Sequence, residues 1–247
     1  MYQNETPKSE PVFNLPTVIV ALGLILVAVH LVRTYLLTMQ QDFLGLLLFA
    51  FWPVRYVEHE IVSMAWPGGD ITKISSFLSY CFLHGGFNHL FFNVIWMAAF
   101  GTALARRFGT ARFLIFSAIC GVAGAAAHLA AYWGDSAPLI GASAAISGQM
   151  SGSIRFVFEM GGPLGAFRSG SPHAYNVPAS PLVESFSNPQ VLGFVAVWFG
   201  INLLFGLWSA PLAGEGANIA WQAHVGGFVA GLILFRFFDP VKRYHPQ

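Results

Sequence analysis

Three short polar motifs lie within stretches of sequence that are otherwise strongly apolar. The first centres on Ser143 and the second on His224, while in the third His89 precedes Asn93 by four residues. A serine hydroxyl becomes a nucleophile when a base takes its proton, and an imidazole is the usual base. Attack on an amide also needs hydrogen-bond donors for the oxyanion. The Ser143 backbone N–H, the His89 ring and the Asn93 amide are suitable donors, so the motifs indicate serine-dependent amide hydrolysis.

Small residues recur on one helical face in two of these stretches. At steps of three or four residues, the two sets are Ser143, Ser147 and Ser151, and His224, Gly227 and Gly231. Residues at such steps share a helix face, and small residues there let membrane helices approach closely. Packing of the two faces would bring Ser143 and His224 to similar depth. The alternatives are a packing stripe without chemistry and, for His89 and Asn93, an interhelical hydrogen-bond pair.

All eleven acidic residues lie in predicted loops, tails or span ends. No buried carboxylate is therefore expected to orient His224, so the predicted machinery is a Ser–His dyad rather than a triad. Another polar group must orient the imidazole, and Ser147 is the candidate. A proton pump or a carboxylate metal site normally needs an intramembrane acid, which the sequence lacks. The HExxH motif of zinc proteases is also missing.

The composition requires a membrane protein. Of the 247 residues, 55% are hydrophobic and only 9% are charged, whereas soluble domains carry about 25% charged residues. Intrinsic disorder needs low hydrophobicity and high net charge, so this composition excludes it. A net charge of +1 gives no electrostatic attraction for nucleic acid. Cys81 and Cys120 lie in apolar surroundings and do not indicate a redox compartment.

A membrane helix needs about 20 mostly apolar residues. The predicted fold is an all-α polytopic bundle with six spans, at about 15–37, 87–105, 110–132, 141–158, 191–208 and 218–238, and with tails at 1–14 and 239–247.

Two long connections separate these spans. In the outer loop 38–85, the apolar run Phe43–Trp52 is too short to cross and predicts a re-entrant or surface-lying element. The stretch 160–189 is rich in Gly, Pro and Ser and predicts a mobile loop. Six spans leave both termini on one side. That side holds nine of the twelve Lys and Arg residues, which predicts cytoplasmic termini.

The order of the motifs resembles the rhomboid family of intramembrane serine proteases over about residues 15–238. The motifs that carry the resemblance are His84-xxxx-His89-xxx-Asn93, Gly141-x-Ser143 and Ala223-His224-xx-Gly227-xxx-Gly231. The resemblance implies a six-helix bundle around a water-filled cavity that opens to the outer side. It also implies cleavage of transmembrane helices of other membrane proteins near small residues, without a metal or cofactor. The expected location is the bacterial inner membrane.

The resemblance also assigns roles to residues. Ser143 corresponds to the nucleophile, His224 to the general base, and His89 and Asn93 to oxyanion donors. The residues expected to support them are His84, Gly141, Ser147, Gly227 and Gly231. The chain departs from the family at Ala144, where Gly is usual, at Ser147, where an aromatic is often found, and at Ala105, where some members have an acid.

Two other functions remain open from the sequence. Ala144 is compatible with a rhomboid-like protein that binds membrane helices without cutting them. The second alternative is a membrane protein that binds haem and transfers electrons, with axial ligands drawn from His30, His89, His128 and His224. Haem binding leaves Gly141-x-Ser143 and Asn93 unexplained, and His30 and His128 are expected to serve packing.

The loop Ser209–Ala217 contains Pro211, Gly214 and Gly216 and is adjacent to His224. We expect it to cap the cavity and to move with the fifth span when substrate enters. The sequence indicates no oligomeric state.

Overall fold

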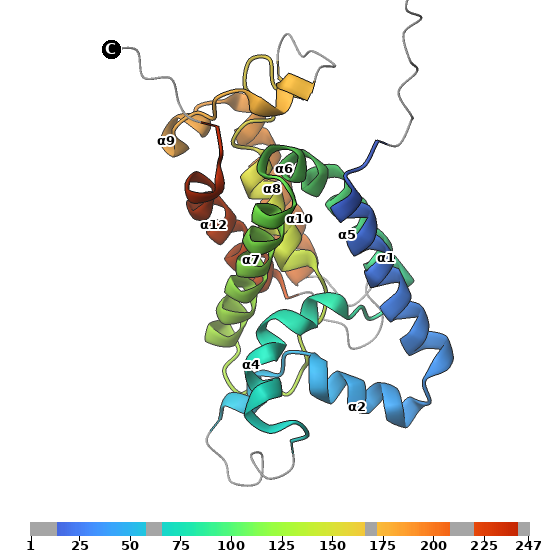
Figure 1. Cartoon of the computed structure of the whole chain (residues 1–247). Helices are drawn as coiled ribbons and strands as arrows, with labels where there is room; N and C mark the ends of the chain where they lie inside the picture. Colours follow the sequence, from blue (N-terminus) through green and yellow to red (C-terminus); the bar gives the residue numbers. More distant parts are fainter. Residues whose placement is uncertain (1–13, 58–65, 166–171, 208–219, 242–247) are drawn as a thin grey trace, which may run out of the picture.

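Residues 14–57, 66–165, 172–207 and 220–241 are described by the computed structural model of the protein. Every regular element in these ranges is a helix (Figure 1), and the β-bridge between Phe51 and Leu139 is isolated. The prediction of an all-α protein is therefore confirmed for the described part of the chain.

Four helical stretches are long and apolar enough to cross a membrane. They are α1 (Thr17–Leu31) with its π-helical extension Val32–Leu36, α5 (Phe87–Trp96) with the π-helical turn Met97–Gly101 and α6 (Thr102–Phe108), α7 (Thr110–Ala131), and α12 (Trp221–Phe238). They agree with the predicted spans at 15–37, 87–105, 110–132 and 218–238.

The remaining two predicted spans correspond to shorter apolar helices. The helix α8 (Ser143–Ser153) has 11 residues, about 16 Å at 1.5 Å per residue, which is less than the ~30 Å hydrocarbon core. It ends before the predicted limit of 158 because the chain turns after Ser153, around the buried Arg155. The helix α10 extends over Pro189–Leu207, and its described apolar part, Pro189–Leu204, is shorter than the four long helices. The count of six spans stays a prediction.

The predicted outer loop 38–85 contains two helices. The helix α2 (Met39–Phe49) has no buried residue, and its N-terminus is fixed by a capping box between Thr38 and Gln41. A short 3₁₀ helix, Pro53–Tyr56, follows it, and α4 (Gly69–Ser79) leads into a second, Tyr80–Phe82. The Arg33 guanidinium binds both carboxylate oxygens of Asp42, at 2.6 and 3.2 Å, and so ties the end of α1 to α2.

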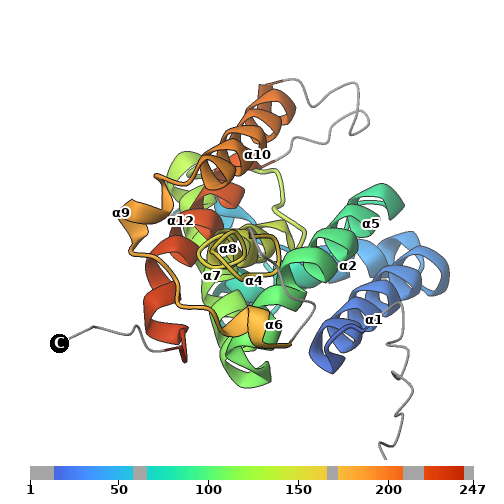
Figure 2. The ribbon, with the colours of Figure 1, turned by 90° about the horizontal axis from the view of Figure 1, so that it is seen from above.

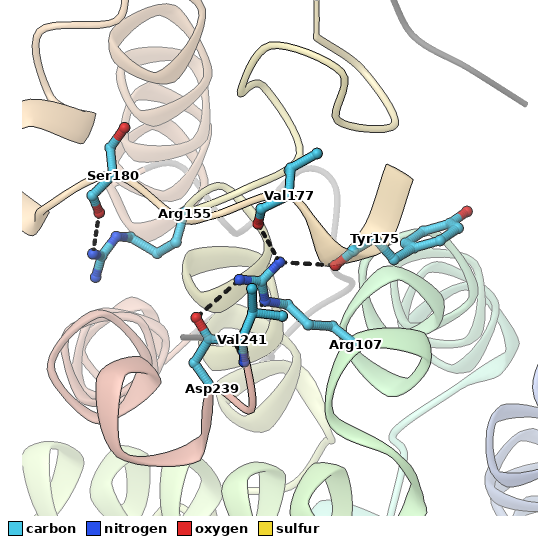
Figure 3. Close-up of polar contacts among 7 residues, drawn as sticks. All are labelled: Arg107, Arg155, Tyr175, Val177, Ser180, Asp239 and Val241. Atoms are coloured by element: carbon cyan, nitrogen blue, oxygen red, sulfur yellow. Dashed lines mark hydrogen bonds and ion pairs between the residues drawn. The ribbon is translucent and has the colours of Figure 1, made fainter. Parts of the chain in front are cut away.

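The stretch 160–189, which we predict to be a mobile loop, contains a 3₁₀ helix (Pro172–Asn176) and α9 (Leu182–Ser185) among its described residues, and its mobility stays a prediction. Two buried arginines hold this segment (Figure 3). Arg107 donates to the carbonyls of Tyr175 and Val177, both at 2.8 Å, and Arg155 donates to that of Ser180 at 2.7 Å. Composition predicts local flexibility, but it does not reveal anchors that lie far away in sequence.

Arg107 also binds the chain beyond α12. Its Nε and Nη2 donate to the two carboxylate oxygens of Asp239 at 2.8 and 2.9 Å. The Arg107 side chain is fully buried and that of Asp239 is 10% exposed. Bidentate pairs of this kind fix geometry as well as adding energy. Together with the bonds that Arg107 and Arg155 make to the segment 172–180, this pair fastens α6, the end of α12 and that segment to one another (Figure 3).

The helix α8 lies near the centre of the bundle, with α1 and α10 towards its edges (Figure 2). Ten of its eleven residues are buried. A Cβ added to Gly227 of α12 would lie 2.0 Å from the carbonyl oxygen of Ala144. A Cβ added to Gly231 would lie 2.4 Å from the carbonyl oxygen of Gly148. On the other side, a Cβ on Gly148 would lie 2.4 Å from Cys120 of α7. Small residues on these faces therefore allow backbone contact between α8 and α12.

Substitution of Gly227 tests this contact. Gly227→Ala should lower the free energy of unfolding by about 1–3 kcal/mol, because the methyl group collides with backbone that cannot move aside. The matched control is Gly200→Ala on α10, where no atom lies within 4 Å of the added Cβ. Unfolding in detergent micelles measures both variants, and equal stability of the two would contradict the packing.

Candidate active site

Ser143 is the first residue of α8, at the end of the helix that has unpaired N–H groups. The preceding turn depends on Gly141, whose φ of +117° is rarely adopted by residues with a side chain. The Gly141 N–H donates to the Tyr80 carbonyl at 3.0 Å, which fixes the entry to the helix. The positive end of the helix dipole thus lies at the Ser143 hydroxyl.

His224 lies in the first turn of α12, and its Nε2 is 2.7 Å from the Ser143 Oγ. The close backbone contacts at Gly227 and Gly231 bring the two helices to this separation. Two residues that are 81 positions apart in sequence thus form a hydrogen bond. A hydroxyl and an imidazole at this distance can exchange a proton.

The other imidazole nitrogen of His224 contacts a residue that the sequence analysis did not single out. His224 Nδ1 lies 2.5 Å from Oδ1 of Asn202 on α10. The suggestion that Ser147 orients His224 is therefore wrong: the Ser147 hydroxyl donates to the Ser143 carbonyl at 2.8 Å, within α8. One signal for Asn202 was available, because it is an amide within the apolar run 191–208.

His89 faces the same small volume as Ser143. A Cβ placed on Gly141 would lie 2.5 Å from His89 Nε2 and 3.7 Å from Ser143 Oγ. The Gly85 N–H donates to His89 Nδ1 at 3.5 Å, which leaves the hydrogen of a neutral ring on Nε2. His89 therefore presents an N–H towards the start of α8.

Asn93 lies one turn below His89 and is buried. Its amide nitrogen donates to the His89 carbonyl at 2.8 Å, and its Oδ1 makes no hydrogen bond within the described residues. One of its two N–H groups is thus used within α5.

The other predicted residues lie around this group. His84 is 1% exposed, and its ring centroid is 5.0 Å from that of His89. Burial, reinforced by the neighbouring His89, lowers the pKa of His84 to about 3, so its ring is neutral near pH 7. His30 is buried against the ring of Phe87, and His128 is buried against the ring of Tyr132.

Ala144 is 1% exposed and points into the bundle. A Cβ on Gly124 of α7 would lie 2.4 Å from the Ala144 methyl group, so the missing side chain of Gly124 makes room for it. The methyl is directed at α7, away from the volume shared by Ser143 and His89.

In the part of the chain that the structure describes, no group of three or more His, Cys, Asp or Glu side chains is arranged to hold a metal ion. The loop Ser209–Ala217, which we expect to cap the cavity, lies outside the described residues.

Comparison with known proteins identifies the family. The model of the Rhomboid domain matches residues 72–238, which covers more than half of the chain. The chain belongs to the rhomboid family. It is 26% identical over 178 residues to the "Rhomboid protease GlpG" of Yersinia pseudotuberculosis, an alignment that covers 71% of this chain and 52% of that protein. This rhomboid thus spans about half the length of the curated relative that it matches.

Family membership and the four apolar helices make this rhomboid an integral membrane protein. The matched region contains both Ser143 and His224, together with α5, α8, α10 and α12. The helix α1 and most of the outer segment 38–85 precede it.

The contact between Gly141 and His89 yields a test with a matched control. Gly141→Ala should both strain the backbone and displace the His89 ring, whereas Gly109→Ala has a positive φ but no atom within 4 Å of the new Cβ. Both variants should lose about 1–3 kcal/mol of stability from backbone strain. Only Gly141→Ala should shift the imidazole NMR signals of His89, and an unshifted signal in that variant would contradict the geometry.

Proposed function

We propose that this rhomboid is an intramembrane serine endopeptidase that cleaves transmembrane segments of other membrane proteins through a Ser143–His224 dyad. The observation that carries the proposal is the 2.7 Å contact between Ser143 Oγ and His224 Nε2 at the start of α8. Such a contact allows the imidazole to take the hydroxyl proton as the oxygen attacks a substrate carbonyl. The matched relative from Yersinia pseudotuberculosis is a rhomboid protease, which supports the same activity.

The surroundings of Ser143 suit the negative charge that develops on the substrate oxygen. Its own N–H is at the N-terminus of α8, and the His89 ring presents an N–H to the same volume. Asn93 completes the proposed set of oxyanion donors through its second amide hydrogen. Removal of one such donor typically lowers kcat by about 10²–10³-fold. In the proposed mechanism, His224 then protonates the leaving amine and later activates the water that hydrolyses the acyl-enzyme.

The two alternative functions each conflict with one observation. A rhomboid-like protein that only binds helices is suggested by Ala144, but the methyl group of Ala144 packs towards Gly124 instead of the reactive volume. A haem protein could use His224 as an axial ligand, but both of its ring nitrogens already contact Asn202 and Ser143. The protease therefore accounts for more of the site than either alternative.

We further propose the finer topology that this activity requires. Six spans, with α8 and α10 as the fourth and fifth, would keep both termini in the cytoplasm of a bacterial cell and the dyad near the outer leaflet. The tails would be 1–14 and 239–247, and the substrates would be transmembrane proteins in the same bilayer.

Fluorophosphonate labelling tests the dyad. Ser143→Ala should abolish labelling, and His224→Ala should slow it by about 10²–10⁴-fold, the usual contribution of a general base. Ser151→Ala is the matched control, because its hydroxyl is on the same helix but donates to the Gly148 carbonyl at 3.0 Å. Equal labelling of Ser143→Ala and the unmodified protein would refute the proposal.

Reporter fusions test the topology. Green fluorescent protein fused after Gln247 should fluoresce, because it folds in the cytoplasm. Alkaline phosphatase inserted after Asp135, between α7 and α8, should be active, because that loop faces the periplasm in the six-span arrangement. A dark carboxy-terminal fusion would place the C-terminus outside the cytoplasm and contradict the proposed topology.

A further inference from the structure

Asn202 is a buried amide on a helix that is otherwise apolar. It is 8% exposed, while its neighbours Ile201 and Leu203 are 46% and 40% exposed. An amide inside a membrane helix is costly unless its polar atoms are hydrogen-bonded. Both polar atoms of Asn202 have partners: Oδ1 contacts His224, and Nδ2 donates to the Trp198 carbonyl at 2.8 Å. The side chain is therefore held from both ends.

The Trp198 carbonyl decides which way the Asn202 amide points. In the opposite orientation, Oδ1 of Asn202 would face the carbonyl oxygen of Trp198, and two acceptors would oppose each other without a hydrogen. The amide oxygen consequently faces His224 Nδ1, 2.5 Å away. A carboxamide oxygen can only accept, so the hydrogen of this contact belongs to Nδ1 of the imidazole.

This hydrogen determines the state of the other ring nitrogen. A neutral imidazole carries one N–H, so a hydrogen on Nδ1 leaves Nε2 with a lone pair. Nε2 is the atom that lies 2.7 Å from Ser143 Oγ. Asn202 thus favours the one tautomer of His224 that can accept the serine proton.

An aromatic contact one helical turn away fixes the position of Asn202. The rings of Trp198 and Phe228 stack with centroids 4.2 Å apart and an interplanar angle of 22°. Trp198 precedes Asn202 by four residues, and Phe228 follows His224 by four, so the two contacts are neighbouring points of one interface between antiparallel helices. Figure 2 shows α10 beside α12 at the edge of the bundle.

We propose that Asn202 is a positioning residue, which holds the imidazole of His224 in the orientation and tautomer that accept the Ser143 proton. This inference rests on the proposed function and deepens it. Its amide replaces the carboxylate of a Ser–His–Asp triad in orienting the base, but it brings no negative charge to stabilise the imidazolium. The arrangement explains how the chain dispenses with a buried acid in an environment where an ionised carboxylate is expensive.

The kinetic test compares three variants with a membrane-embedded peptide substrate in vesicles. Asn202→Leu removes the acceptor at similar volume, and kcat should fall about 10–100-fold, part of the 10²–10⁴-fold that a general base contributes. KM should change less than about twofold, because Asn202 does not touch substrate in this role. Asn202→Asp keeps an acceptor and should restore most of kcat. Val197→Ala, on the same helix and 62% exposed, is the control and should match the unmodified protein.

Nitrogen NMR of histidine-labelled protein tests the tautomer without any turnover. The His224 signals, identified by their loss in His224→Gln, should report a hydrogen on Nδ1 and none on Nε2. In Asn202→Leu they should report the other tautomer or a mixture. If Asn202→Leu fails to fold, Asn202→Ala provides the same comparison, because it also lacks the acceptor.

The two tests separate this inference from the proposed function. An unchanged tautomer in Asn202→Leu overturns the role of Asn202, even if kcat falls, because the loss would then be structural. An unmodified protein that neither cleaves substrate nor reacts with fluorophosphonate refutes the protease, while the NMR result still decides whether Asn202 sets the state of His224. A parallel change in kcat and tautomer supports both.

Discussion

The backbone contact between α8 and α12 is the constraint on which the site depends. Gly227 lies against the Ala144 carbonyl so closely that no side chain fits between them. Within a bilayer, helices gain little from burying apolar surface, because lipid tails are as apolar as leucine, and close van der Waals packing of small residues must hold them together. The same face of α12 carries His224, and the same face of α8 begins with Ser143. Packing that stabilises the bundle therefore also sets the distance between hydroxyl and imidazole.

The site extends from this contact through side chains on two further helices. The turn at Gly141 directs the start of α8 and at the same time leaves room for the His89 ring from α5. On the opposite side, Asn202 reaches the imidazole from α10. At the far end of the bundle, the buried Arg107 guanidinium donates hydrogen bonds to Asp239 and to two backbone carbonyls, which take the place of water. The buried side chains of Asn202 and Arg107 thus each contact a group on another element, and these contacts help to define how the helices are arranged.

Much of this arrangement could be predicted from residue types and spacing. The steps from Ser143 to Ser151 and from His224 to Gly231 indicate two faces made for close approach, and the two faces do meet. The helix α1 with its π-helical extension, α7 and α12 each lie within a few residues of the predicted apolar runs. These features could be predicted because helix periodicity and hydropathy depend on residues that are close together in the sequence.

Other features depend on contacts that no local pattern contains. Apolar composition does not distinguish a helix surrounded by lipid from one surrounded by protein. The sequence therefore did not reveal that α8 is a short helix buried among its neighbours. The segment 172–185 is rich in residues that favour turns, yet arginines from α6 and from the end of α8 hold it in place. The contact between Asn202 and His224 forms only when α10 packs against α12. The sequence shows a lone amide in an apolar run, but it does not reveal that His224 is its partner.

The location of Asn202 also has a mechanical consequence. The helix α8 is enclosed by neighbours and α6 is locked to the end of α12, whereas α10 lies at the margin of the assembly, and its described contacts with α12 include the Trp198–Phe228 stack and the Asn202–His224 contact. In the proposed role of Asn202, a change in the seating of α10 would alter the contact between Asn202 Oδ1 and His224 Nδ1, whereas Ser143 is carried by the enclosed helix α8. The state of the proposed base therefore depends on how one marginal helix, α10, packs against α12.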